Sequence, residues 1–158
     1  MTINIISLII AMLAIIVGPI VSYKIASRQI KAKYIIGEKQ KAISSIKEIL
    51  QKILFNRSIL MSHAIQYRNF AKESITEYEE NTNPIFEDLI LQYSRLLLAL
   101  DINNTNQKKL YNSISTSIDP LEDSSPEWEK NFIQKSQDIS ILSKEIITEM
   151  EERILKDL

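Results

Sequence analysis

The sequence predicts an all-α protein, in which one N-terminal transmembrane helix precedes a cytoplasmic antiparallel bundle of about four helices. Three observations support this fold class. The first 23 residues carry no charged side chain. Apolar residues recur three and four positions apart along the rest of the chain, and no segment alternates with the two-residue period of a strand. We assign residues 1–23 to the transmembrane helix, 24–38 to a basic neck and 39–158 to the bundle.

The apolar run at residues 5–21 predicts the transmembrane helix, since roughly 20 apolar residues suffice to cross a bilayer. Basic residues follow this run instead of preceding it, which is the reverse of a secretory signal. An excess of Lys and Arg marks the cytoplasmic side of a span. We therefore expect a single-pass protein with its N-terminus outside and its body in the cytoplasm.

One face of the predicted span carries small residues at spacings of three and four. These residues are Ser7, Ala11, Ala14, Gly18 and Ser22. Helices in lipid associate through close packing of such residues, so the stripe favours a homo-oligomer. Because small residues are common in spans, a chance arrangement is the alternative. Pro19 lies beside the stripe and predicts a kink in the packing or pore-forming helix.

The neck that follows carries Lys24, Arg28 and Lys31 on one helical face, with Lys33 close by. Each basic residue near an anionic membrane surface contributes about 1 kcal/mol of attraction. RNA binding would need a broader basic surface with aromatic side chains for stacking. We therefore expect membrane lipid as a partner of the neck, and we do not expect direct nucleic-acid binding.

Composition excludes several classes of site. The chain has no Cys, one His and two Gly, which removes disulfides, thiolate chemistry, multi-His metal sites and phosphate-binding glycine loops. We expect no metal and no cofactor. Residues 1–57 hold nine Lys or Arg against two Glu, whereas the remainder holds ten Lys or Arg against 18 Asp or Glu. A basic neck thus precedes an acidic body.

The bundle begins with a long helical stripe that follows a candidate break at Gly37. The stripe consists of Ile43, Ile46, Leu50, Ile53, Arg57, Leu60, Ala64, Tyr67, Ala71, Ser74 and Tyr78. Residues 79–84 are then expected to form a loop. Asn83 is a suitable N-cap, and Pro84 a suitable first residue, for a helix that runs to about Leu100.

Two further helices are predicted. Thr105 can cap a short one, and Ser125 with Pro126 signals the start of the last, after a polar loop at 119–124. The predicted core positions are Phe86, Leu89, Ile90, Tyr93, Leu96, Leu97 and Leu100; then Leu110, Tyr111, Ile114 and Ile118; and finally Trp128, Phe132, Ile139, Leu142, Ile146, Met150 and Ile154.

Two stretches resemble a broad group of small bacterial membrane proteins. Residues 39–47 resemble the group's Arg-Gln-x-Trp-Ile-x-x-Leu-Arg neck, with Ala42 where Trp is usual. Residues 98–110 resemble its Leu-x-Leu-Asn-Pro segment, with Asp101 and Ile102 in place of Asn and Pro. The architecture is also similar to the membrane accessory protein of type VI-B, RNA-targeting CRISPR systems. That resemblance implies a bacterial inner-membrane pore that dissipates the membrane potential during phage infection. It also implies a HEPN-like bundle and an RNA-targeting CRISPR nuclease, or its products, as partner.

Arg57 and His63 are the one candidate catalytic pair, because they fit the loose Arg-x4-6-His spacing of HEPN ribonucleases. The Arg would stabilise phosphorane charge and the His would transfer a proton. Six residues on one helix, however, place two side chains about 120° apart, and Ser58 replaces the usual Asn, Asp or His. Arg57 also occupies a position on the apolar stripe, where a charge needs a partner or an exit to water. We do not expect enzymatic activity.

The function that these features predict is an oligomeric membrane pore or permeability effector that depolarises the inner membrane, in antiphage defence. Two alternatives stay open. One is a membrane-tethered helical adaptor that binds a soluble partner, and the other is a membrane-tethered HEPN-type ribonuclease.

Overall fold

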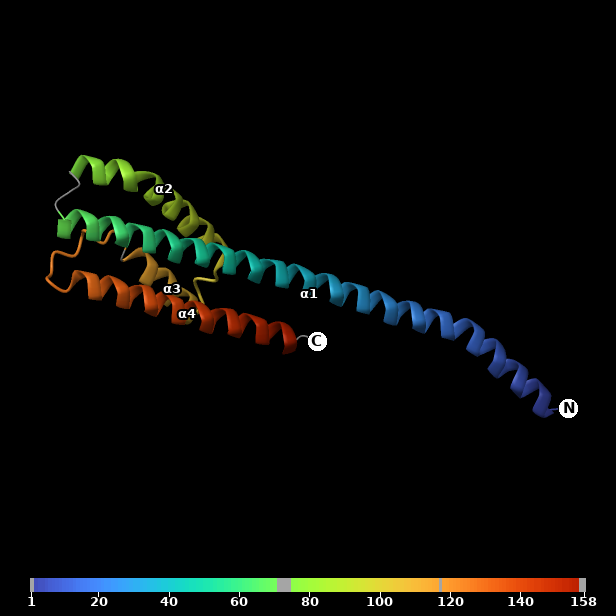
Figure 1. Cartoon of the computed structure of the whole chain (residues 1–158). Coiled ribbons are helices and arrows are strands. Elements are labelled where there is room, and N and C mark those ends of the chain that lie inside the picture. The colour runs from blue at the N-terminus through green and yellow to red at the C-terminus, as the bar shows by residue number, and fades with distance from the viewer. Residues whose placement is uncertain (1, 71–74, 117, 157–158) are drawn as a thin grey trace. The chain divides into compact units, whose positions relative to one another are not determined.

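The computed structural model describes the backbone of residues 2–70, 75–116 and 118–156, and the side chains of these residues except 2–18 and 69–70. These residues form four helices and no strand, which confirms the all-α class (Figure 1). The helices are α1 (Thr2–Phe70), α2 (Ile75–Ala99), α3 (Thr105–Ser115) and α4 (Trp128–Lys156).

The chain divides into two compact units, residues 1–40 and 41–157. The first unit is the N-terminal part of α1, which contains both Pro19 and Gly37 in its interior. The break expected at Gly37 is wrong. A glycine inside a helix costs only about 1 kcal/mol relative to alanine, and the run of good helix formers at residues 38–42 offsets that cost. The kink at Pro19 stays a prediction.

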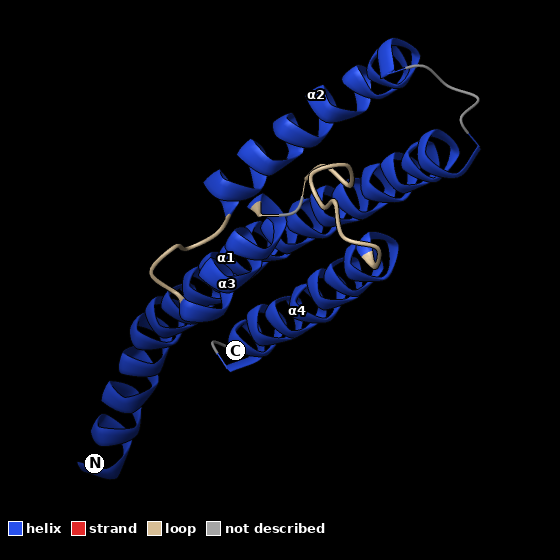
Figure 2. Cartoon of the chain, turned by 90° about the vertical axis from the view of Figure 1, so that its left-hand side faces the viewer, coloured by secondary structure: helices blue, strands red, loops and turns tan. Residues whose placement is uncertain are grey.

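The second unit is an antiparallel helical bundle, as predicted (Figure 2). Lys47 of α1 pairs with Glu151 near the end of α4, at 2.6 Å, whereas Arg57 contacts Phe132 near its start. Helices α1 and α4 therefore run in opposite directions. The side chain of Asn104, just before α3, lies 3.5 Å from that of Glu149. Helix α3 therefore begins beside the end of α4 and runs back against it.

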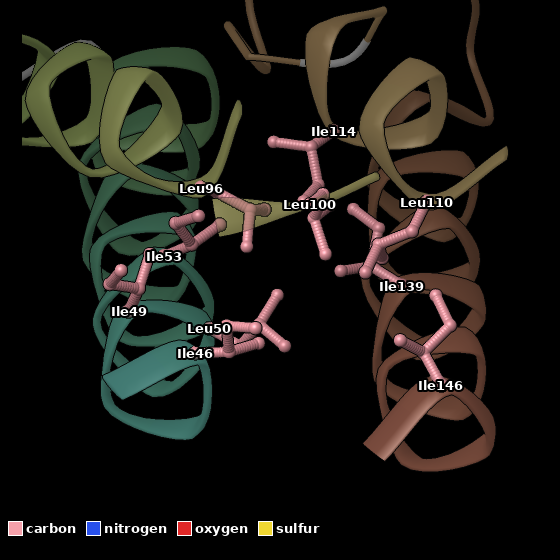
Figure 3. Close-up of a cluster of buried hydrophobic side chains, with 10 residues drawn as sticks. All are labelled: Ile46, Ile49, Leu50, Ile53, Leu96, Leu100, Leu110, Ile114, Ile139 and Ile146. Carbon is pink, nitrogen blue, oxygen red and sulfur yellow. The ribbon is translucent and has the colours of Figure 1, made fainter. Parts of the chain in front are cut away.

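Two apolar clusters form the core of this bundle. The larger one draws side chains from all four helices into one space (Figure 3): Ile46, Ile49, Leu50, Ile53, Leu96, Leu100, Leu110, Ile114, Ile139 and Ile146. The smaller one contains Met61, Ala64, Tyr78, Trp128 and Phe132. The predicted stripes of α1 and α4 are thus confirmed as core faces.

Helix α2 differs from the prediction in where it starts. The expected loop at 79–84 lies inside α2, so Asn83 is not an N-cap and Pro84 is an interior residue. Pro84 cannot donate to the carbonyl of Glu80, but both residues are exposed, so water can satisfy that carbonyl. Of the last positions of the stripe predicted from Ile43 onward, Ala71 and Ser74 lie outside the described residues, and Tyr78 belongs to α2.

Helix α2 also buries a narrower face than predicted. Leu89, Leu96 and Leu100 are buried, whereas Ile90 and Leu97 are exposed. The buried positions of α2 recur at spacings of three, four and seven, and residues 90 and 97 lie one position beyond them, about 100° around the helix. The apolar residues on α2 therefore outnumber the positions that the bundle can cover.

The cap of α3 lies one residue earlier than predicted. The side chain of Asn104, not that of Thr105, accepts hydrogen bonds from the backbone of Asn106 and Gln107. The side-chain Oε1 of Gln107 in turn accepts a hydrogen bond from the backbone N–H of Asp101 at 2.6 Å. These bonds satisfy the donors at the helix start and hold the connection to α2 in place.

Arg68 holds the segment between α3 and α4 against the last turn of α1. Its guanidinium donates to the carbonyls of Pro120, Leu121 and Asp123, at 3.4, 3.0 and 2.8 Å. The same group lies over the Trp128 ring, 4.4 Å from its centroid. A planar, permanently charged donor suits both contacts. This interaction sets the position from which α4 starts.

We expect Arg68→Ala to lower the free energy of unfolding by about 1.5–3 kcal/mol, because three carbonyls lose a charged donor. Arg68→Lys recovers only part of that loss, since an ammonium lacks the planar fork. Urea unfolding followed by circular dichroism and by the fluorescence of Trp128, the one tryptophan of the chain, measures both. The control is Arg153→Ala, which breaks an exposed pair with Glu149 and should cost below about 0.5 kcal/mol. Equal losses in Arg68→Ala and Arg153→Ala would contradict this role.

Candidate functional site

Arg57 lies in the interior of the bundle with 1 % of its surface exposed. Its Nε donates to Ser136 Oγ at 3.1 Å, and its guanidinium stacks on Phe132 with 4.2 Å to the ring centroid. Burial lowers the pKa of Arg57 to about 10, so the group is still charged at neutral pH. A charged residue on the apolar stripe was expected to need a partner, and Ser136 and Phe132 are two such partners.

His63 lies on the same helix as Arg57 and is half-buried. The helix places the two side chains about 120° apart, and the side chain of Arg57 extends into the bundle toward α4. A phosphate could reach the guanidinium only if the bundle opened. The positions of Arg57 and His63 thus do not support a shared catalytic site.

A layer of polar side chains that the sequence did not predict lies beside Arg57, between α1 and α2. The side chains of Asn56 and Gln92 both donate to the carboxylate of Asp88, at 2.7 and 2.9 Å. These hydrogen bonds, that of Asn56 foremost, lower the pKa of Asp88, with help from the charges of Lys52 and Arg95. The sequence signal was weak, since Asn, Asp and Gln at these spacings also suit an exposed face.

An open groove of about 360 Å³ lies between α1 and α2 and extends from this polar layer. Its lining consists of Ser45, Glu48, Ile49 and Lys52 on α1, and Gln92, Arg95, Leu98 and Ala99 on α2. We call it the α1–α2 groove. The lining combines one carboxylate, two cations and an apolar wall. Gln92 is 2 % exposed, and its Oε1 has no hydrogen-bond partner among the described residues.

The four basic residues named in the neck, Lys24, Arg28, Lys31 and Lys33, are all exposed on the surface of the N-terminal unit. Pro19 and Ser22 are exposed as well.

The other stripe residues, Ser7, Ala11, Ala14 and Gly18, lie outside the residues whose side chains are described, as does most of the apolar run at 5–21. Among the described residues, no helix has an apolar stretch long enough to span a membrane.

No metal centre is evident in the described part of the chain, where no three His, Asp or Glu side chains are grouped to hold an ion. Comparison with family models, with curated proteins and with solved structures finds no match to this chain.

We expect Arg57→Ala to destabilise the bundle by about 2–5 kcal/mol, because the substitution leaves a cavity beneath Phe132. Arg57→Met fills most of that volume without a buried charge, so its cost should stay below about 1.5 kcal/mol. Ser136 keeps a bond in either variant, since its hydroxyl donates to the carbonyl of Phe132. Urea unfolding distinguishes the two variants. Equal losses would contradict the packing role and favour a specific need for the charge.

Asp88 should make the bundle sensitive to acid. Its pKa in the folded state lies below the ordinary value of 3.8, so its stabilising contribution is complete above pH 3.8 and is lost as pH falls through the lowered pKa. Asp88→Asn should therefore flatten the fall in stability below pH 4, at the expense of stability at pH 7. Thermal unfolding between pH 2.5 and pH 7 measures this. The control is Asp138→Asn, which changes an exposed carboxylate that accepts one hydrogen bond, from Gln134. An unchanged acid profile for Asp88→Asn would refute the assignment.

Proposed function

We propose that this chain is a membrane-anchored helical protein that self-associates and permeabilises the bacterial inner membrane. One observation carries the proposal: an uncharged N-terminal segment of 23 residues passes directly into an exposed basic segment on the same helix, α1. An apolar span followed by Lys and Arg is the pattern of an anchored helix with a cytoplasmic body.

The exposure of the neck supports a role at the lipid surface. Lys24, Arg28 and Lys31 share a face of α1 and are exposed. Solvated ammonium and guanidinium groups attract anionic headgroups at about 1 kcal/mol each. The neck would hold the start of the cytoplasmic part at the inner leaflet.

Self-association is required because one span per chain cannot enclose a channel. The small residues Ser7, Ala11, Ala14, Gly18 and Ser22 offer a face for close helix packing. The resemblance to the membrane accessory protein of type VI-B CRISPR systems supports extending the proposal to antiphage defence. An RNA-targeting CRISPR nuclease, or its products, would then act upstream.

A membrane-tethered adaptor is the second candidate, and the exposed apolar side chains on α2 favour it. Under that reading the bundle binds a soluble partner and the membrane stays intact. A HEPN-type ribonuclease draws no support from Arg57, whose guanidinium is engaged with Phe132 and Ser136 inside the bundle.

The test is reconstitution of the full chain into liposomes that contain anionic lipid, with an imposed potassium gradient. We expect the chain to float with the liposomes and to collapse the potential. The triple variant Lys24→Gln, Arg28→Gln, Lys31→Gln should weaken the dependence on anionic lipid. A matched variant with Lys130, Lys135 and Lys144 of α4 changed to Gln should not. Flotation without loss of potential would overturn the pore and leave the adaptor, and failure to float would overturn both.

A further inference from the structure

We propose that the α1–α2 groove binds Leu98 of a second copy of this chain, and that the two copies exchange this leucine reciprocally. The inference rests on the self-association in the proposed function, and it names the surface of the bundle that would join copies in pairs. The small-residue face of the N-terminal segment would then join the pairs into a larger assembly.

Leu98 is far more exposed than the other leucines of α2. It is 88 % exposed, although it lies on a helix whose opposite face is buried. Leu91 lies seven residues before Leu98 on the same face of α2 and is exposed as well. Ile90 and Leu97 are exposed on the adjoining face, and Ile102 follows just beyond the helix. Several exposed apolar residues close together on one helix, instead of scattered single residues, are typical of a protein interaction surface.

The α1–α2 groove has the shape and the walls to receive such a side chain. Leu98 stands at its rim, while Ile49 and Ala99 supply apolar lining. A space of about 360 Å³ is ample for one leucine and part of the helix that carries it. When each of two copies has a projecting residue beside a matching recess, a twofold axis lets both contacts form at once.

The charges of the groove favour a second copy over a partner of one charge sign. Glu48 on α1 faces the same groove as Arg95 on α2 and Lys52 on α1. A twofold arrangement can set Glu48 of each copy against the cations of the other, which makes the surface complementary to itself. The existing Glu48–Lys52 pair, at 3.1 Å, is exposed and exchanges at little cost.

Gln92 adds an independent reason to expect an occupant. Its Nε2 donates to Asp88, yet its Oε1 is buried without a hydrogen-bond partner among the described residues. A buried acceptor in this state is costly. Gln92 lines the groove, so a donor such as Arg95 of the second copy, entering with Leu98, would satisfy it after a small side-chain rotation.

The absence of cysteine from the chain allows a direct test of this pairing. Full-length Leu98→Cys and Ser45→Cys chains, carrying tags of different mass, are mixed in detergent and oxidised. Ser45 lines the groove, so we expect a mixed cross-linked dimer. The control mixes Leu155→Cys with Ser45→Cys, because Leu155 is an exposed leucine of α4 away from the groove, and it should not cross-link.

A second measurement uses the mass of the particle in detergent. Leu98→Asp should weaken association at least tenfold while Leu155→Asp leaves it unchanged, and circular dichroism should show both folded. If the Leu98→Asp variant assembles as the wild type does, and no mixed cross-link forms, this inference is overturned and the proposed function is unaffected. A wild-type chain that is monomeric at all concentrations would overturn both.

Discussion

The bundle depends on the burial of one face of α1. Ile46, Leu50 and Ile53 are almost completely covered, and side chains of the other three helices share the space that they line. Each buried aliphatic side chain contributes about 1.5–3 kcal/mol relative to exposure. Helices α2, α3 and α4 all contribute side chains to the cluster that this face lines, so their positions depend on it.

A polar layer divides the core at the level of residues 56 and 57. The larger apolar cluster reaches Ile53 and Ile139, and the smaller begins at Met61 and Phe132. Arg57 with Ser136 fills the interval toward α4, and Asn56 with Asp88 fills it toward α2. Buried polar groups of this kind penalise any shift of one helix along another, because a shift would leave them without partners. The layer therefore defines the register in which the helices pack. Its side chains are engaged with one another inside the bundle, which supports a structural role for them.

One face of α2 packs into the core of the bundle, and the other face is exposed. The narrow face with Leu89 and Leu96 completes the core. The exposed apolar residues on its outer side, such as Leu91 and Leu98, and the charged residues of the α1–α2 groove are not part of the core. The outer face of α2 is therefore the part of the bundle that we propose holds copies of the chain together.

The sequence by itself determined the helical class and most of the buried positions. The period of Trp128, Phe132, Ile139 and Ile146 predicted the core face of α4, and that of Ile46, Leu50 and Ile53 predicted the face of α1, because a helix buries one stripe whatever it packs against. Local signals failed at Gly37 and Pro84, where the helix continues through residues that usually end one. Only the tertiary structure decided which neighbour each stripe meets. The partners of Arg57 and Arg68 lie 79 and 52 to 55 positions away, and no local pattern encodes such a pairing. The reason is physical: periodicity records which side of a helix avoids water, whereas the packing of whole helices selects the side chains that cover it.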